Sequence, residues 1–105
     1  MTQLRDTRFV VLADSYLVLT DPHQADTWKV CAVDFPICAN GPDAPVAEDR
    51  FVEEVLMYFK KQISVQGMTS VLEHLAVVGK RKQPSDANFG VKVSISPDGK
   101  VAPKA

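Results

Sequence analysis

The stretch from Asp43 to Gly67, DAPVAEDRFVEEVLMYFKKQISVQG, decides the fold, because its pattern predicts one long α-helix. Apolar residues recur in it at intervals of three and four, which places them on one face of a helix. Asp43 is a preferred N-cap residue, Pro45 is tolerated in the first turn, and Gly67 is typical of a helix end. We therefore expect this stripe to pack on a sheet, with Leu56 and Phe59 buried. The full stripe consists of Phe51, Val52, Val55, Leu56, Phe59 and Ile63.

The segments before this helix have the composition of β-strands. Thr7–Ala13 is a nearly continuous apolar run rich in β-branched residues, and Tyr16–Thr20 is a second such run. The two form either a tight hairpin or one long bent strand, and the pattern does not decide between them. Trp28–Phe35 alternates between apolar and polar residues, so we expect it to pair antiparallel with Tyr16–Thr20 across a polar loop.

The segment Met68–Val78 has two interpretations. Ser70 opens a capping-box pattern, which favours a short helix from about that residue, passing into extended chain near Val77. In the alternative, Leu75–Arg81 forms a strand that pairs with Val91–Ile95. We favour the helix.

The remaining pattern predicts a single α+β domain over residues 1–105. Val91–Ser96 alternates as a strand does, and Pro97, Asp98 and Gly99 indicate a turn after it. We expect loose termini at residues 1–6 and 100–105. The predicted architecture has two layers, an antiparallel sheet of about four strands against one long helix, with a short second helix or hairpin after it.

Composition places the chain among soluble globular proteins. It has 105 residues, 46% apolar and 24% charged, with a net charge of −1. Such a charge gives no general attraction to nucleic acid or to an anionic membrane. No apolar run approaches the length of a membrane span, and no apolar signal core follows the first charges, so we expect a cytoplasmic location. Cys31 and Cys38 are then expected to be reduced and partly buried, whereas a disulfide between them would require the chain to bend at Pro36.

Catalytic chemistry finds little support in the sequence. The glycines are scattered singly, and no phosphate-binding loop, nucleophile elbow or zinc-protease motif occurs. His23 lies between Asp21 and Asp26 without the spacing of a metal site, and we interpret that loop as solvated. We expect no catalytic residue, no bound metal and no cofactor.

Three surfaces remain as candidates for binding. A small sheet with one helix leaves a face uncovered, so we expect a homodimer whose interface draws on the apolar strands. A basic cluster before a polar loop could contact phosphates. A third candidate is a pocket between sheet and helix. The interface residues would be Phe9, Val11, Tyr16 and Val18, the nucleic-acid residues Lys80, Arg81 and Lys82, and the pocket residues Trp28, Tyr58 and His74.

A short motif before the helix adds a family resemblance. Phe35-Pro36 precedes Cys38 and Gly41, and the helix that follows contains the acidic pair in Glu53–Leu56. In this the chain resembles HicB-type small antitoxin domains, although Ile37 stands where that family usually has an acid. The resemblance implies an α+β fold and a binding role. Our leading hypothesis is a non-enzymatic, antitoxin-like regulatory protein that acts through protein–protein contacts. The alternatives are a nucleic-acid-binding accessory protein and a small-molecule-binding protein or minor enzyme.

Overall fold

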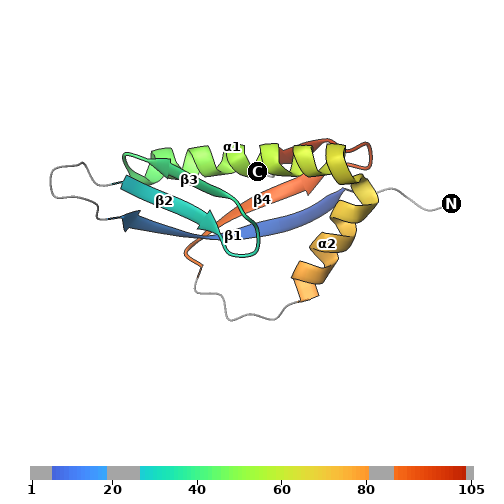
Figure 1. Ribbon diagram of the computed structural model, residues 1–105, viewed down its shortest axis with the longest axis horizontal. Coiled ribbons are helices and arrows are strands. Elements are labelled where there is room, and N and C mark those ends of the chain that lie inside the picture. Colours follow the sequence, from blue (N-terminus) through green and yellow to red (C-terminus); the bar gives the residue numbers. More distant parts are fainter. Residues whose placement is uncertain (1–5, 19–26, 81–86, 104–105) are drawn as a thin grey trace.

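A computed structural model describes residues 6–18, 27–80 and 87–103 and shows an α+β fold. A five-stranded antiparallel sheet packs against one long helix, and a second helix leaves the end of the first at a steep angle (Figure 1). The two-layer architecture predicted from the sequence is confirmed, with one strand more than expected. The elements in chain order are β1 (Thr7–Val18), β2 (Thr27–Ala32), β3 (Cys38–Gly41), α1 (Ala44–Gln66), α2 (Met68–Lys80), β4 (Phe89–Ile95) and β5 (Val101–Pro103).

The central strand β1 pairs with different partners along its two halves. The strand order is β3-β2-β1-β4-β5, and all neighbours are antiparallel. Residues 13–18 pair with β2, whereas residues 7–13 pair with β4. Past the end of that second ladder, the Asn88 side chain replaces a strand residue, because its amide bonds both the N–H and the C=O of Ser15 at 2.8 Å. Of the two alternatives for the first apolar runs, one long strand is therefore correct.

From Arg8 to Tyr16 the side chains of β1 alternate between an exposed and a more buried environment. Val11 and Ala13 are fully buried beneath α1, whereas Val10 and Leu12 point to the opposite face of the sheet and are exposed. The core thus lies between α1 and one face of the sheet. Its buried residues are Val11, Ala13, Val30, Phe35, Ile37, Ala39, Ala47, Phe51, Val55, Phe59, Val71, Val91, Val93, Ile95 and Val101.

The long helix α1 begins and ends where the sequence predicted. The Asp43 carboxylate accepts a hydrogen bond from the Val46 N–H at 3.0 Å, which satisfies one of the free donors of the first turn. At the other end Gly67 has a φ of 89°, a conformation that favours glycine, and its N–H bonds the Ile63 carbonyl at 3.0 Å. Both caps are confirmed.

Phe59 is the aromatic centre of the core. Its ring lies edge-on to that of Phe9, at a centroid distance of 5.0 Å, and to that of Phe35, at 5.2 Å. The predicted burial of Phe59 is confirmed, but Leu56 is only partly buried. The face of the helix that meets the sheet is centred on Phe51, Val55 and Phe59, so Leu56 lies at the margin of this face.

The second helix corrects two expectations. It begins at Met68, where the Val71 N–H bonds the Gly67 carbonyl at 3.3 Å, and not at Ser70. It stays helical to Lys80, without the predicted change to extended chain near Val77. The strand alternative fails because β4 pairs with β1 and β5 instead.

The C-terminal hairpin is a further correction. The N–H of Ser96 bonds the carbonyl of Lys100 at 2.9 Å across a turn in which Gly99 has a φ of 90°. This turn lays β5 beside β4, where Val101 pairs with Ile95 and is buried. The prediction of a loose end from Lys100 was therefore wrong for Lys100 to Pro103, although the turn itself was correctly identified.

Candidate functional site

Four large apolar side chains lie exposed on the sheet face that α1 does not cover. We call them the open-face patch: Val10 (50% exposed), Leu12 (37%), Tyr16 (43%) and Val33 (45%). The first three alternate along β1, and the N–H of Val33 bonds the Leu12 carbonyl at 2.9 Å, which places Val33 beside Leu12. Gly90 lies opposite Leu12 in β4, and a Cβ there would stand 3.1 Å from a methyl group of Val10. The glycine leaves this part of the patch free of a larger side chain.

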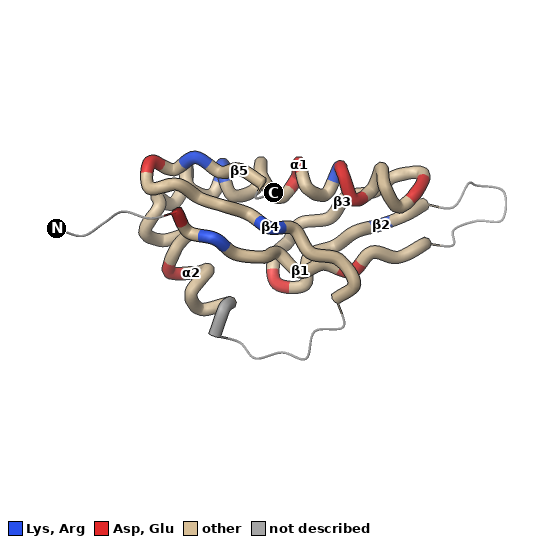
Figure 2. The backbone as a smooth tube through the Cα atoms, turned by 180° about the vertical axis from the view of Figure 1, so that it is seen from behind, with Lys and Arg blue, Asp and Glu red and all other residues tan. Residues whose placement is uncertain are grey.

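Charged residues of both signs lie around and within the patch, where Asp14 separates Leu12 from Tyr16 along β1. Arg8 and Asp14 are exposed at opposite ends of the β1 segment that carries Val10 and Leu12. Lys92 lies beside Val10 in the register of β4. Neither sign collects into one large area of the described chain (Figure 2). Among the described residues this face therefore carries no broad basic area of the kind that nucleic-acid phosphates attract.

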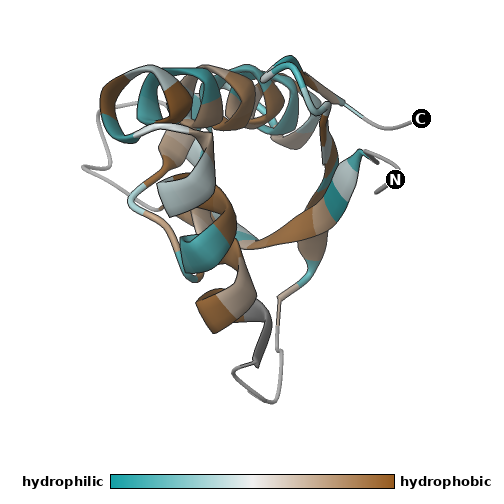
Figure 3. Ribbon diagram, turned by 90° about the vertical axis from the view of Figure 1, so that its right-hand side faces the viewer, coloured by the Kyte–Doolittle hydropathy of each residue, from teal (hydrophilic) through white to brown (hydrophobic). Residues whose placement is uncertain are grey.

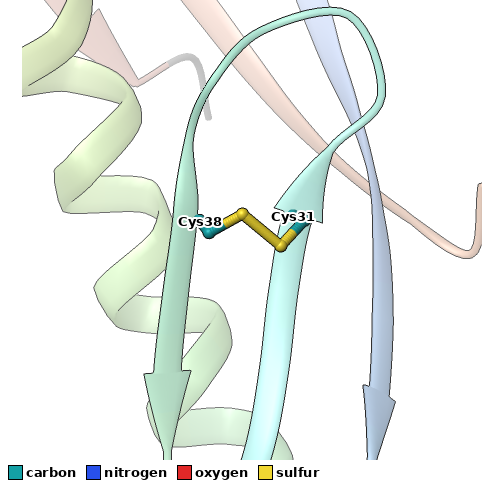
Figure 4. The surroundings of a disulfide bond; sticks show 2 residues. All are labelled: Cys31 and Cys38. Atoms are coloured by element: carbon teal, nitrogen blue, oxygen red, sulfur yellow. A yellow bond between two sulfur atoms is a disulfide. The ribbon is translucent and has the colours of Figure 1, made fainter.

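A disulfide crosses the open face between the two strands at its edge. Cys31 and Cys38 face each other in the β2–β3 register, with Cα atoms 4.1 Å apart (Figure 4). The neighbouring pair is joined by a hydrogen bond from the Ala32 N–H to the Ile37 carbonyl at 2.8 Å. The cysteines therefore occupy a non-hydrogen-bonded pair, the kind in which antiparallel strands bring side chains closest.

The expectation of two reduced cysteines is thus wrong. A tight turn at Pro36, in which the Ile37 N–H bonds the Phe35 carbonyl at 2.8 Å, returns the chain on itself. This turn sets the register that brings the sulfurs together. A spacing of seven residues does not reveal such a register, although the proline signalled the bend on which it depends.

A pocket of about 430 Å³ lies beside the edge strand β3, against the flank of α1. Its lining joins the turn before β3 to two successive turns of the helix. The lining residues are Pro36, Ile37, Cys38, Glu54, Met57, Tyr58 and Lys61. The pocket is of the size and mixed apolar character that small ligands or single peptide side chains occupy.

The predicted pocket residues are not gathered in one site. Tyr58 lines the pocket just described. His74 reaches only the far side of Phe35, whose ring centroid is 5.8 Å from that of His74 and 6.0 Å from that of Tyr58. Trp28 pairs with Gly41, at the opposite end of β3 from the pocket. The residues that the sequence interpretation missed lie in the Pro36–Cys38 turn.

The predicted interface residues divide between the two faces. Tyr16 belongs to the open-face patch, and Val18 has the same parity at the end of β1. Val11 is wholly buried, and Phe9 packs on Phe59, so both belong to the covered face. In the first half of β1 the exposed positions are therefore Val10 and Leu12, because an apolar run without alternation does not tell which parity meets the helix.

The predicted basic cluster and the loop around His23 lie partly or wholly outside the described residues. Lys80 is the last residue of α2, and Arg81, Lys82 and His23 fall outside the described residues. Within the described ranges no group of three or more metal-ligating side chains is assembled. No helix among those residues is both long and apolar enough to cross a membrane.

Comparisons of the chain with protein-family models, with curated proteins and with solved structures found no match. The resemblance to HicB-type domains therefore rests on the motif residues alone.

Proposed function

We propose that the protein is a non-enzymatic binding protein that acts through protein–protein contacts and forms a homodimer through its open-face patch. The observation that carries the proposal is the exposure of Val10, Leu12, Tyr16 and Val33 on one face of the central strands. Burial of apolar surface is worth about 25 cal/mol per Å², so exposed apolar side chains of this kind favour association.

The sequence of β1 makes this face complementary to itself. Along the exposed side of the strand, Arg8, Val10, Leu12 and Asp14 follow one another as basic, apolar, apolar and acidic. Two sheets stacked face to face about a two-fold axis at Val11 would place Val10 over Leu12 of the second copy. The same axis places Arg8 over Asp14 of the second copy, at both ends of the apolar contact. Sheets packed in this way stand about 10 Å apart, within reach of those side chains.

The primary experiment measures the mass of the protein in solution by light scattering at micromolar concentration. We expect a mass near twice the 11.5 kDa of the chain. Leu12→Lys should return it to the monomer, because it places a charge in the apolar centre of the contact. Val65→Lys is the matched control, since Val65 is also an exposed aliphatic residue but lies on α1 and not on the sheet. A monomer for the unmodified chain would overturn the dimer.

A charge exchange tests the register of the dimer more finely. Arg8→Glu should weaken association, because it opposes Asp14 of the second copy with a like charge. Asp14→Arg should weaken it likewise, and the double exchange should restore most of the affinity. If the double exchange is as weak as the sum of the two single changes, the face-to-face register is incorrect.

An antitoxin-like regulatory role is the version of this proposal that the HicB-type resemblance supports. The dimer would then present its remaining surface to a second protein. Purification from the native host, with mass spectrometry of co-purifying proteins, tests this role when wild type and Leu12→Lys are compared. A partner that binds only the dimer is expected; the absence of any stoichiometric partner would contradict the regulatory role but not the dimer.

The cytoplasmic location remains a separate proposal, and the disulfide argues against it. Disulfides persist in oxidising compartments and are rare in the cytoplasm. Counting free thiols in protein taken directly from its host decides the matter for Cys31 and Cys38. Two reactive thiols per chain would favour the cytoplasm, and none would favour an oxidising compartment.

A further inference from the structure

The edge strand β3 has one position whose backbone groups are free to pair with another chain. Ala39 and Gly41 direct their N–H and C=O groups toward β2, because the hydrogen bond between Ala32 and Ile37 fixes which pairs of this ladder are bonded. Cys38 and Asn40 consequently direct theirs outward, to the edge of the sheet. The Asn40 carbonyl is occupied by a hydrogen bond from the Arg50 guanidinium at 2.9 Å. Among the described residues, no side chain bonds the outward N–H or C=O of Cys38 in this way.

These free groups open onto the pocket between β3 and α1. Ile37 and Pro36 contribute an apolar floor beside Cys38, and the Met57 and Tyr58 side chains form the opposite wall. Met57 is 58% exposed, and an exposed methionine adapts its shape to many apolar side chains. The site thus combines a free strand edge with an apolar cavity, which are the two parts of peptide recognition by strand addition.

Two charges of opposite sign mark the ends of the pocket. Glu54 and Lys61 both line it, two helical turns apart on α1. Neither side chain has an ion-pair or hydrogen-bond partner within the described ranges. A helix rise of 1.5 Å per residue separates their Cα atoms by about 10 Å, a distance that three or four residues of extended chain span.

The order of these charges along β3 follows from the contacts between β3 and α1. Gly41 lies against the first turns of the helix, since a Cβ on it would come within 2.6 Å of the Ala47 nitrogen. Phe35, before the strand, lies against Tyr58. The helix therefore runs antiparallel to β3, with Glu54 nearer the Gly41 end and Lys61 nearer the Phe35 end.

We propose that this β3 groove, formed by the Cys38 edge and the pocket lining, binds an extended peptide that adds to the sheet as a further antiparallel strand. The peptide places an apolar side chain in the pocket, a basic side chain toward Glu54 and, C-terminal to them, an acidic side chain toward Lys61. Antiparallel addition continues the pattern of the whole sheet. The groove shares no residue with the open-face patch, so the two proposals stand on different surfaces.

The probe is the fluorescently labelled peptide acetyl-Lys-Thr-Leu-Thr-Glu-amide, whose lysine, leucine and glutamate share one face of a strand. With its leucine opposite Ile37, the first threonine bonds Cys38. N-methylation of that threonine should weaken binding at least tenfold by fluorescence anisotropy, because it removes the donor. N-methylation of the leucine, whose N–H points away from β3, is the matched control and should have little effect. Equal losses for the two would overturn strand addition.

Variants of the protein test the charges and keep this proposal separate from the dimer. The reversed peptide, acetyl-Glu-Thr-Leu-Thr-Lys-amide, should bind at least threefold more weakly than the probe. The double exchange Glu54→Lys with Lys61→Glu should invert that preference, whereas Glu53→Lys, outside the pocket on the same helix, should not. Leu12→Lys should bind the probe as the unmodified chain does, whatever its oligomeric state. Absence of measurable binding at millimolar peptide, in a protein whose melting temperature is normal, would overturn the groove as a peptide site.

Discussion

At the centre of β1, the two faces of the strand differ in what covers them more than in the type of residue they carry. Val11 is fully buried, whereas its neighbour Val10 is 50% exposed, although both are valines in the middle of the same strand. The difference lies in α1, which packs its buried residues on one parity of the strand and leaves the other uncovered. One face therefore contributes to the core, and the other is left uncovered by α1, which lies along one side of the sheet (Figure 3).

This comparison also explains the composition of each face. Positions beneath α1 are filled by apolar residues, and the described chain has no buried polar or charged side chain at all. The open face mixes apolar residues with the charged residues Arg8, Asp14 and Lys92. Substitutions on the two faces should accordingly separate into effects on stability and effects on association.

The largest effect is expected at the centre of the covered face. Phe59→Ala should lower the free energy of unfolding by about 3–5 kcal/mol, the usual loss for a large core aromatic. Met57→Ala, on the exposed side of the same helix, should cost less than about 1 kcal/mol. Denaturant unfolding monitored by circular dichroism measures both. Similar losses for the two would contradict the assignment of the covered face.

The disulfide is the one feature of the open face that we expect to contribute strongly to stability. It closes a short loop between Cys31 and Cys38, for which the chain-entropy relation gives about 2–3 kcal/mol. The double substitution Cys31→Ser with Cys38→Ser should lower the unfolding free energy by that amount. Reductant should destabilise the unmodified protein to the same level and leave the double variant unchanged. A reductant effect on the double variant would point to a different origin.

A matched pair in β1 tests the comparison most directly. Val11→Ala removes two buried methyl groups and should lower the free energy of unfolding by about 2 kcal/mol. Val10→Ala should change the stability of the monomer by no more than about 0.5 kcal/mol, because its side chain is half exposed. Thermal unfolding at low protein concentration, where a dimer dissociates, isolates this difference. Equal costs for the two would show that the open face is covered in solution.

The features that the sequence predicted correctly are local ones. The N-cap at Asp43, the end of α1 at Gly67 and the turn at Gly99 each depend on a few neighbouring residues. In α1 apolar residues recur with the helical period over 23 residues, so the pattern is repeated several times within one element. Such signals need no knowledge of the rest of the fold.

The features that sequence analysis missed depend on register between distant segments. The disulfide requires Cys31 to lie opposite Cys38, and β5 exists only because the hairpin places Val101 beside Ile95. Which side of β1 is buried depends on where α1 packs. The helix is distant in the sequence, because its Glu48, which accepts a hydrogen bond from the Ser15 hydroxyl of β1, lies 33 residues further along. Apolar content alone does not specify these pairings.

The candidate sites show the same division. An uncovered sheet face was expected from the number and order of elements, and Tyr16, one of the predicted interface residues, lies exposed on it. The pocket was expected between sheet and helix, but only Tyr58 of its three proposed residues lines the cavity. The lining residues that were not predicted come from the Pro36–Cys38 turn. This turn lies beside α1 through a tertiary contact, which the local sequence does not specify.

The smallest effect is expected where the covered face ends, at the turn that joins β4 to β5. The pKa of Asp98 is lowered from its ordinary value of 3.8, mainly by a hydrogen bond from the Ser96 hydroxyl and further by the Lys100 N–H and charge. Because the folded state lowers this pKa, the charged carboxylate stabilises the turn at neutral pH, and the contribution is lost as the pH falls through the lowered value. Asp98→Asn should therefore lower the melting temperature slightly at pH 7, and the difference from the unmodified protein should shrink as the pH falls through the lowered pKa. The side chain is fully exposed, so water and salt screen its interactions and the shift should be the least of those predicted here. A difference between the two proteins that persists unchanged in acid would show that the substitution acts through the geometry of the turn and not through the charge.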